Sequence, residues 1–181
     1  MSNDGLLSAV LSDTVTDPDA LVAELFAAEG RSLVRLARIF CDDRAAAEDL
    51  VQEAFMRLHR SAGSIRDPQR APAFLRSIVI NLARDHNRRG LMSLRHQSAA
   101  PPVVPIEPSP EDETVGGEDD RAVLAAVRLL PDRQRACIVL RYYLEYSESE
   151  TAETLEISKN SVKTHCRRAL ASLEATLEAP R

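Results

Sequence analysis

Tryptophan is absent from this 181-residue sequence, and its aromatic side chains are limited to three tyrosines and four phenylalanines. Hydrophobic residues still make up 44% of the chain, so any core must be built mainly from Leu, Val, Ile and Ala. That mixture favours helices. The length suits one ordinary domain or two small ones. We therefore predict an all-α protein.

Cysteine is also scarce, because only Cys41, Cys137 and Cys166 occur and none of them forms a C-x-x-C pair. An odd number at such wide spacing excludes a disulfide framework and a zinc site within the chain, so we expect no metal and no cofactor. Free cysteines of this kind are usually small core or surface residues.

Long apolar runs are missing as well. The start, MSNDGLLSAVLSD, has neither the basic region nor the apolar stretch of a signal peptide. No run elsewhere approaches the roughly 20 apolar residues that a membrane span requires. We expect a cytoplasmic protein without membrane insertion.

Charge is sorted by segment along the chain. The net charge of −5 argues against a protein that coats nucleic acid through bulk electrostatics. The charged residues among the first thirty are all acidic. By contrast, residues 76–95 contain five Arg and one Asp, and residues 159–168 contain four Lys or Arg and no acid. The two basic segments are where we expect DNA contact.

The first block predicts three helices. Asp17 and Pro18 supply a cap and a first helical residue, with Gly30 as a candidate bend, and Asp42 or Asp43 can cap the second helix. The apolar stripe of that second helix recurs at steps of three and four residues. It consists of Ala47, Leu50, Val51, Ala54, Phe55 and Leu58.

The third helix follows residues 61–72, whose Gly, Pro, Ser and Asp content predicts a loop ending at Pro72. His86 falls on its apolar side and is expected to be a packed or boundary residue there, not a ligand. We expect this helix to bury Leu75, Ile78, Val79 and Leu82, and to carry Ser77, Asn81, Arg84 and Arg88 on the opposite side.

Residues 99–117 contain five Pro, two Gly and four acids but no basic residue. Such a segment cannot bury enough apolar surface to offset the entropy of ordering, so we read it as a flexible spacer. The sequence therefore predicts an acidic tail over 1–17, a first domain over 18–96, a linker over 97–118 and a second domain over 119–178.

The second block ends in a predicted helix-turn-helix. A first helix carries Val123, Leu124, Val127 and Leu130 and breaks at Pro131, after which Asp132 can cap the next helix. Further along, Ser147 and Glu150 form a capping-box pattern, residues 155–157 predict a tight corner, and Ser158 can cap the last helix. Short helix, corner and longer helix are the parts of this motif. The apolar face of the last helix consists of Val162, Cys166, Ala169, Leu170, Leu173 and Leu177.

The outer face of the last helix has the chemistry of DNA contact. Phosphates need Lys, Arg and short polar donors, and base edges in the major groove need residues such as Asn, Lys or Arg near the start of an inserted helix. The alternative is that this face is only solvated. The same two interpretations, phosphate contact or a solvated surface, apply to Arg84, Arg88, Arg89 and Arg95 near the end of the third helix. The outer-face residues are Asn160, Lys163, Thr164, Arg167 and Arg168.

Three stretches of the chain, in a fixed order within roughly residues 22–177, are similar to sequences of a known protein family. These are AAAEDLVQEAFMRLHR, AFLRSIVINLARDHNRR and LPDRQRACIVLRYYLEYSESETAETLEISKNSVKTHCRRALASL. The chain resembles the extracytoplasmic-function class of bacterial sigma factors in the sigma-70 family. The resemblance implies a factor that binds core RNA polymerase and directs promoter recognition, DNA opening and transcription initiation, with sigma region 2 in the first block and sigma region 4 in the second.

Partners and site residues follow from this resemblance. It implies docking on the largest-subunit clamp helices and the flap region of the polymerase, binding to promoter DNA, an anti-sigma factor as a further partner, and a monomer when free. The implied polymerase-binding residues are Glu48, Asp49, Gln52, Glu53 and Arg57. The implied −10 residues are Arg66, Arg70, Phe74, Ser77, Asn81, Arg84, Arg88 and Arg89. The implied −35 residues are Ser158, Lys159, Asn160, Ser161, Lys163, Thr164, Arg167 and Arg168.

The sequence departs from the family pattern at two positions. Family members often have Trp where Phe74 stands and Gly where Glu156 stands, so Glu156 is expected in a backbone conformation that suits Gly.

Two rival functions stay open. SKNSVKTHCRRAL also resembles the DNA-binding helix of response-regulator activators, so a conventional transcription regulator is one alternative. An enzyme is the other, although the four His at positions 59, 86, 96 and 165 are dispersed and no Gly-rich phosphate loop is present. Catalysis of RNA synthesis would belong to the polymerase, and we expect none from this chain.

Overall fold

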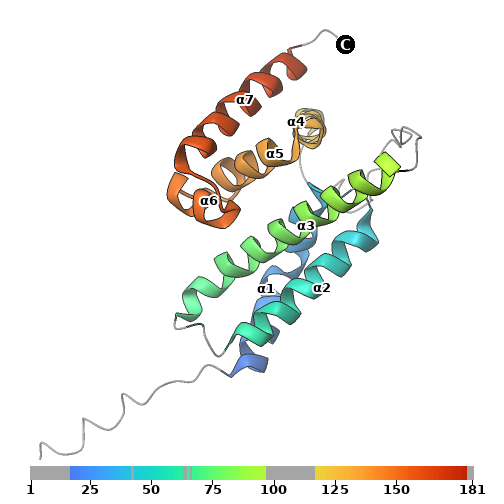
Figure 1. The fold of residues 1–181 in the computed structure, drawn as a ribbon. Helices are drawn as coiled ribbons and strands as arrows, with labels where there is room; N and C mark the ends of the chain where they lie inside the picture. Colours follow the sequence, from blue (N-terminus) through green and yellow to red (C-terminus); the bar gives the residue numbers. More distant parts are fainter. Residues whose placement is uncertain (1–16, 42, 63–64, 66, 97–116, 179–181) are drawn as a thin grey trace, which may run out of the picture.

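A computed structural model describes residues 17–41, 43–62, 65, 67–96 and 117–178 of the chain. Within these ranges the backbone forms helices and connecting turns, and it contains no strand. The all-α prediction is therefore confirmed. The helices form two groups, which meet along the third helix, labelled α3 in Figure 1 (Ala71–His96). Nearly all of the predicted acidic tail and of the predicted linker lies outside the described residues.

The first group begins with α1, Pro18–Arg38. The Asp17 side chain caps this helix by accepting a hydrogen bond from the backbone N–H of Asp19 at 3.1 Å. The helix runs through Gly30 without interruption, so the expected bend is wrong. Buried Leu25 and Leu33 on either side of Gly30 share one packed stripe, and this packing offsets the helix-weakening effect of a single glycine.

The second helix, α2, spans Arg44–Ser61 and packs against α1. Asp43 caps it through both carboxylate oxygens, which accept from the backbone N–H groups of Ala45 and Ala46 at 3.2 Å each. Asp42, the other candidate cap, lies outside the described residues. All six residues of the predicted apolar stripe are buried, which confirms the orientation of α2.

The third helix, α3, spans Ala71–His96 and follows a short 3₁₀ helix, η2, at Pro68–Arg70. Leu75, Val79 and Leu82 are buried as predicted, but Ile78 is only half-buried and Ile80 is buried in its place. The expectation that His86 is a packed or boundary residue is wrong. This residue is exposed together with Asp85, Arg88 and Arg89, because α3 leaves the core after Ala83.

The second group contains α4 (Glu118–Leu129), α5 (Asp132–Ile138), the π-helix η4 (Val139–Tyr143), α6 (Glu148–Leu155) and α7 (Lys159–Leu177). Pro131 separates α4 from α5 as predicted. The prediction that Asp132 caps α5 is wrong, because Pro131 occupies the cap position and makes no side-chain bond. The Asp132 carboxylate turns instead to Arg84 of α3, whose Nε lies 3.3 Å from its Oδ2.

The helix-turn-helix has the predicted parts. Ser147 and Glu150 form a reciprocal capping box, in which Ser147 Oγ accepts from Glu150 N at 3.2 Å and Glu150 Oε2 accepts from Ser147 N at 2.7 Å. Glu156 ends α6 in the left-handed region at φ 52° and ψ 48°, as expected from its position. Ser158 then caps α7 by accepting from Ser161 N at 3.1 Å.

Buried apolar residues of both groups belong to one connected core. In Figure 1, α3 lies between the first two helices on one side and α5 and α6 on the other, and α3 contacts both of the latter. The three cysteines are buried and form no disulfide. Burial raises the pKa of the Cys137 thiol to about 12, so this residue is a packing residue and not a reactive thiolate.

Candidate nucleic-acid interface

The outer face of α7 begins at the corner of the helix-turn-helix. Ser158 and Ser161 are joined through their hydroxyl groups at 2.8 Å, which fixes the first turn of the helix. The long basic side chains further along the face reach into solvent, and Thr164 is half-buried with its hydroxyl donating to the Asn160 carbonyl at 2.9 Å. The exposed residues of the predicted −35 set are Ser158, Lys159, Asn160, Lys163, Arg167 and Arg168.

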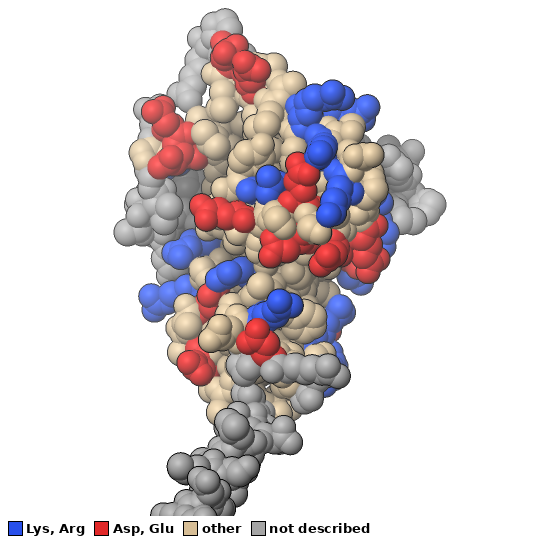
Figure 2. Space-filling view, turned by 90° about the vertical axis from the view of Figure 1, so that its left-hand side faces the viewer, with Lys and Arg blue, Asp and Glu red and all other residues tan. Residues whose placement is uncertain are grey.

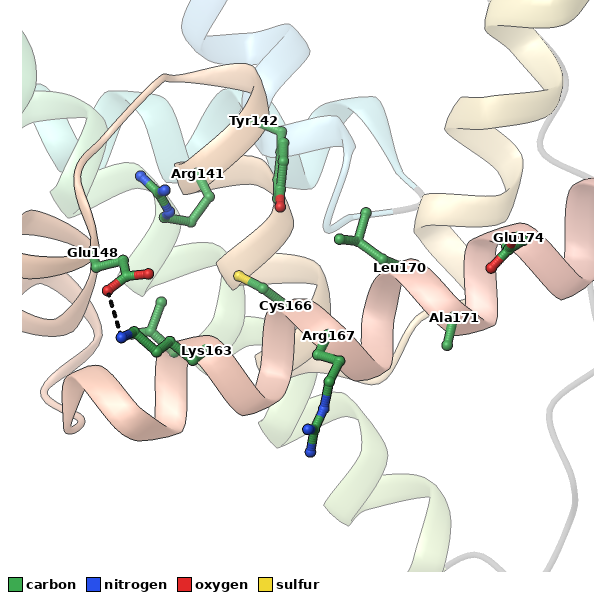
Figure 3. Close-up of a pocket in the computed structure, with 10 residues that line it drawn as sticks. Arg141, Tyr142, Glu148, Lys163, Cys166, Arg167, Leu170, Ala171 and Glu174 are labelled. Carbon is green, nitrogen blue, oxygen red and sulfur yellow. Dashed lines mark ion pairs between the residues drawn. The ribbon is translucent and has the colours of Figure 1, made fainter.

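Lys163 has one acidic neighbour, Glu148 of α6, at 3.6 Å (Figure 3). The two side chains are 62% and 39% exposed, so water screens their attraction. Ion pairs of this kind contribute about 0–1 kcal/mol. Lys163 can therefore exchange this partner for a phosphate or a base edge at small cost.

A shallow groove runs between η4 and α7 behind the outer face. Figure 3 shows Tyr142, Cys166 and Leu170 toward this groove, whose lining also includes Lys163 and Arg167. Tyr142 is 58% exposed and Leu170 is 43% exposed, so the groove presents apolar surface to solvent. It gives the second domain an apolar contact surface beside its basic one.

His165 lies on α7 among these basic residues but adds no charge to them near neutral pH. Burial lowers its pKa from the usual 6.5, and the neighbouring Arg133 and Arg168 lower it further. The positive charge of the α7 face at neutral pH therefore comes from lysines and arginines alone.

The predicted −10 side of α3 is partly covered by the second group of helices. Asn81 donates through Nδ2 to the Thr154 carbonyl at 3.1 Å, and Arg84 pairs with Asp132. The hydroxyl groups of Ser77 and Thr154 lie 3.4 Å apart. These three α3 residues are half-buried against the second group of helices.

The rest of the predicted −10 set is more open. Arg70, Arg88 and Arg89 are exposed, and Phe74 is 43% exposed. Arg88 pairs with Asp85 at 3.3 Å, but both side chains are more than half exposed, so this pair is also weak. Arg66 lies outside the described residues.

The predicted polymerase face of α2 carries paired charges. Glu48 accepts from Arg44 Nε at 2.7 Å, and Glu53 accepts from Arg57 Nε at 2.7 Å. The hydrogen bond from Arg57 holds the pKa of Glu53 below its ordinary value. Asp49 and Gln52 are exposed beside these pairs, so the face is hydrated and rich in charge.

Sequence reasoning missed the residues through which the second domain contacts the first. Tyr146 donates its hydroxyl to the Ala73 carbonyl at 2.9 Å, and Asp132 and Thr154 contact α3 as described above. These contacts join residues 48 to 77 positions apart in the chain. In the sequence, Asp132 was singled out only as a helix cap after Pro131, and nothing near it in the chain indicates its contact with α3.

Acidic and basic side chains are interspersed on the face of the molecule drawn in Figure 2. Among the described residues, no helix is long and apolar enough to cross a membrane. The same part of the chain contains no cluster of His, Cys, Asp or Glu suited to a metal ion.

Two family models match the chain in the order of its two helical groups. The model of sigma-70 region 2 matches residues 25–90, and the model of sigma-70 region 4 matches residues 120–173. The chain is 35% identical over 156 residues to the ECF RNA polymerase sigma factor SigM of Mycobacterium tuberculosis, a match covering 85% of this chain and 76% of SigM. It is 35% identical over 150 residues to the RNA polymerase sigma-E factor of Streptomyces coelicolor, with 82% and 81% covered.

Solved structures show the same fold. The sigma factor RpoE in complex with the anti-sigma factor NepR from Bartonella quintana matches with a TM-score of 0.69 at 22% identity, over 88% of this chain and 98% of that one. CnrH in complex with the cytosolic domain of CnrY matches with a TM-score of 0.61 at 25% identity, over 92% of each chain.

Proposed function

Because this chain belongs to the extracytoplasmic-function class of sigma-70 RNA polymerase sigma factors, we propose that its α2, α3 and α7 faces bind the polymerase, the −10 element and the −35 element respectively. A sigma factor binds core RNA polymerase and directs promoter recognition, DNA opening and transcription initiation, and that is the function of this chain. In our proposal it performs no catalysis itself and acts in the cytoplasm as a monomer before it meets the polymerase.

The strongest support for assigning these faces is the exposure of the basic residues on α7. Its basic residues are exposed on a helix that starts directly after the helix-turn-helix corner. The first turn of such a helix reaches base edges in the major groove, and later residues meet phosphate. We therefore assign Asn160 and Lys163 to base contact, and Arg167 and Arg168 to the DNA backbone. Ser158, Lys159, Ser161 and Thr164 belong to the same interface.

For the −10 element, we assign the side of α3 that carries Ser77, Asn81 and Arg84, with Arg88 and Arg89 as phosphate contacts. The exposed ring of Phe74 provides an aromatic surface on which a base can stack. Arg70 precedes α3 and would extend the basic surface, and we assign Arg66, which lies outside the described residues, to the same set. The amide and guanidinium groups of α3 supply the hydrogen-bond donors that DNA recognition uses.

For polymerase docking, we assign the α2 face of Glu48, Asp49, Gln52, Glu53 and Arg57. The opposite side of α2 is fully committed to the core, so this face is available to a partner. Its charges match a charged protein surface such as the clamp helices, because complementary charges set orientation and association rate. The apolar groove at Tyr142 and Leu170 would meet the flap region.

We further propose two domains, over 18–96 and 119–178, joined by a linker over 97–118. An anti-sigma factor is a fitting further partner, since RpoE was solved with one.

The function is tested by transcription. The purified chain is mixed with core polymerase free of other sigma factors and a random-sequence DNA library, and bound fragments are recovered and transcribed. We expect fragments that share two elements at a fixed spacing and that give transcripts only when the chain is present. Recovery of fragments that need a second sigma factor would support the conventional regulator instead.

Charge reversal tests the docking face. The Glu48→Lys, Glu53→Lys variant should bind core polymerase at least about tenfold more weakly, because like charges placed at an interface repel. The matched control is the Glu24→Lys, Glu145→Lys variant, which reverses two exposed carboxylates, one on α1 and one in the connection between η4 and α6, and should bind like wild type. Wild-type affinity of the α2 variant, with helicity unchanged, would place docking elsewhere.

A further inference from the structure

We propose that Glu148 of α6 is a specificity-determining residue of the −35 interface, which holds the ammonium group of Lys163 and directs it to a guanine edge instead of a phosphate. This inference rests on the proposed role of Lys163 in base contact. It adds an acidic residue from the first helix of the helix-turn-helix to an interface that otherwise consists of basic and small polar residues. Glu148 acts through Lys163, so it is a positioning residue and need not contact DNA itself.

The backbone of α6 fixes the place of the Glu148 carboxylate. Glu148 is the first residue of this helix, and it stands between the two members of the capping box, Ser147 and Glu150. Their reciprocal hydrogen bonds, at 3.2 Å and 2.7 Å, hold the first turn of the helix. A negative side chain in a first turn is favoured by the partial positive charge at the start of a helix. Glu148 is therefore an acid on a fixed support, directed at α7.

Lys163 of α7 is the partner of this acid. Its Nζ lies 3.6 Å from Glu148 Oε2, and the dashed line in Figure 3 joins the two side chains. Arg141 lines the same groove, but its guanidinium donates to the Tyr146 carbonyl. Within the part of the chain that the structure describes, Lys163 is the only side chain that forms an ion pair with Glu148. The pair therefore connects the two helices of the helix-turn-helix.

Lys163 differs in this respect from the other basic residues of the outer face. Lys159, Arg167 and Arg168 are exposed, and in the described ranges none of them forms an ion pair. An acid beside a DNA-binding face lowers the affinity for every sequence, because a carboxylate repels phosphate. Glu148 thus weakens nonspecific attraction at one position of the face, while the three other cations keep theirs.

The ion pair changes which DNA group Lys163 can bind. A free ammonium group attracts phosphate, whereas a cation and an anion 3.6 Å apart carry no net charge, and the anion repels the phosphate. Lysine has three N–H donors, so two remain when one is directed at Glu148. The O6 and N7 atoms of guanine are uncharged acceptors on the major-groove edge, and lysine binds both together. The paired Lys163 therefore favours guanine over phosphate.

Glu148 also restricts the reach of a long side chain. The lysine stem is flexible, so a free Lys163 can turn to phosphates on either side of the major groove. The Lys163 and Glu148 side chains are 62% and 39% exposed, and water screens their attraction. Ion pairs with this exposure shift an equilibrium by up to about fivefold. That factor sets the size of the effect on base preference.

The test compares the −35 preferences of holoenzymes that contain different variants of the chain. Promoter fragments recovered with the wild-type chain are randomised across the −35 element, and each holoenzyme selects from this library at several salt concentrations. Lys163→Ala first identifies the base pair that Lys163 contacts. At that base pair, Glu148→Gln should lower the preference for guanine by about two- to fivefold. The slope of log affinity against log salt should steepen by about 0.9, because the freed Lys163 binds one more phosphate.

Two further variants separate positioning from a general charge effect. In the Lys163→Ala background, Glu148→Gln should leave the base preference unchanged, because the residue that it directs is gone. Glu178→Gln is the matched control, since it removes an exposed acid from the far end of α7. Glu178 lies about four turns of helix after Lys163, or about 22 Å, which exceeds the Debye length at physiological salt. Its base preference and salt slope should equal those of wild type.

An unchanged guanine preference or an unchanged salt slope for Glu148→Gln would overturn the proposal. An equal loss of preference in the Lys163→Ala background would overturn it as well, since Glu148 would then act without Lys163. The same changes in Glu178→Gln would show a general effect of charge and no positioning.

Failure of the proposed function is distinguishable. If the wild-type chain recovers no promoter fragments, the function itself is wrong. If Lys163→Ala alters no base preference, the assignment of Lys163 to base contact is wrong, and the role of Glu148 is rejected with it. If Lys163→Ala behaves as stated and Glu148→Gln does not, the function stands and only the role of Glu148 is rejected.

Discussion

Replacement of Glu156 by glycine should stabilise the second domain. Glu156 ends α6 with φ 52° and ψ 48°, a left-handed conformation in which the Cβ of an L-residue meets the following carbonyl. The corner is held by the chain around it, since the N–H of Ile157 donates to the Ala152 carbonyl at 3.0 Å. Glycine is the residue that this kind of helix end prefers.

The size of the gain follows from two opposing contributions. The left-handed conformation costs an L-residue about 1–2 kcal/mol, which glycine does not incur. Glycine loses more backbone entropy on folding, which takes back about 0.5–1 kcal/mol. The Glu156 side chain is exposed, so its loss removes little packing. The free energy of unfolding should rise by about 0.5–1 kcal/mol. For a domain of this size, that raises the midpoint of thermal unfolding by about 2–8 °C.

The assay is thermal unfolding of the full chain, followed by circular dichroism or calorimetry at one pH and salt concentration. Glu156→Ala is the matched control, because alanine keeps the Cβ but removes the charge. Its stability should change by less than about 0.5 kcal/mol, the size of an acid's interaction with the end of a helix. Glu145, at φ 57°, offers a second position where glycine should also stabilise.

An equal rise in the unfolding midpoint for Glu156→Ala and Glu156→Gly would refute this reasoning, because the added stability would then come from removing a charge. A fall in the midpoint for Glu156→Gly would refute it as well, since it would mean that the corner does not strain the residue it holds.

Three further substitutions test other parts of the second domain. Lys163→Ala should change preference among −35 sequences by about 1–3 kcal/mol, whereas Arg168→Ala should weaken all sequences alike and reduce the salt dependence of holoenzyme binding; the reverse pattern would mean that the helix docks the other way round. Hydrogen bonds from the Ser147 side chain and backbone hold the pKa of Glu150 below 4.5, so its carboxylate adds stability that is lost as the pH falls through this lowered pKa. Unfolding of Glu150→Gln should therefore depend less on pH in that window than unfolding of wild type, and identical pH profiles would contradict the assignment.

The features that the sequence predicted correctly depend on residues close together in the chain. The caps at Asp17, Asp43 and Ser158 and the capping box at Ser147 each involve a side chain and a backbone group two or three residues away. The buried stripe of α2 depends only on helical period. Local chemistry of this kind is complete in a short window, so it can be read without knowing the fold.

The features that escaped prediction depend on how the two domains meet. Asp132 was expected to cap α5, but a cation 48 positions away attracts its carboxylate instead. The side of α3 that carries Asn81 was correctly separated from the apolar side, yet nothing in its spacing indicates that Thr154 covers it. His86 was misplaced because the helical period continues past Ala83 while the core does not.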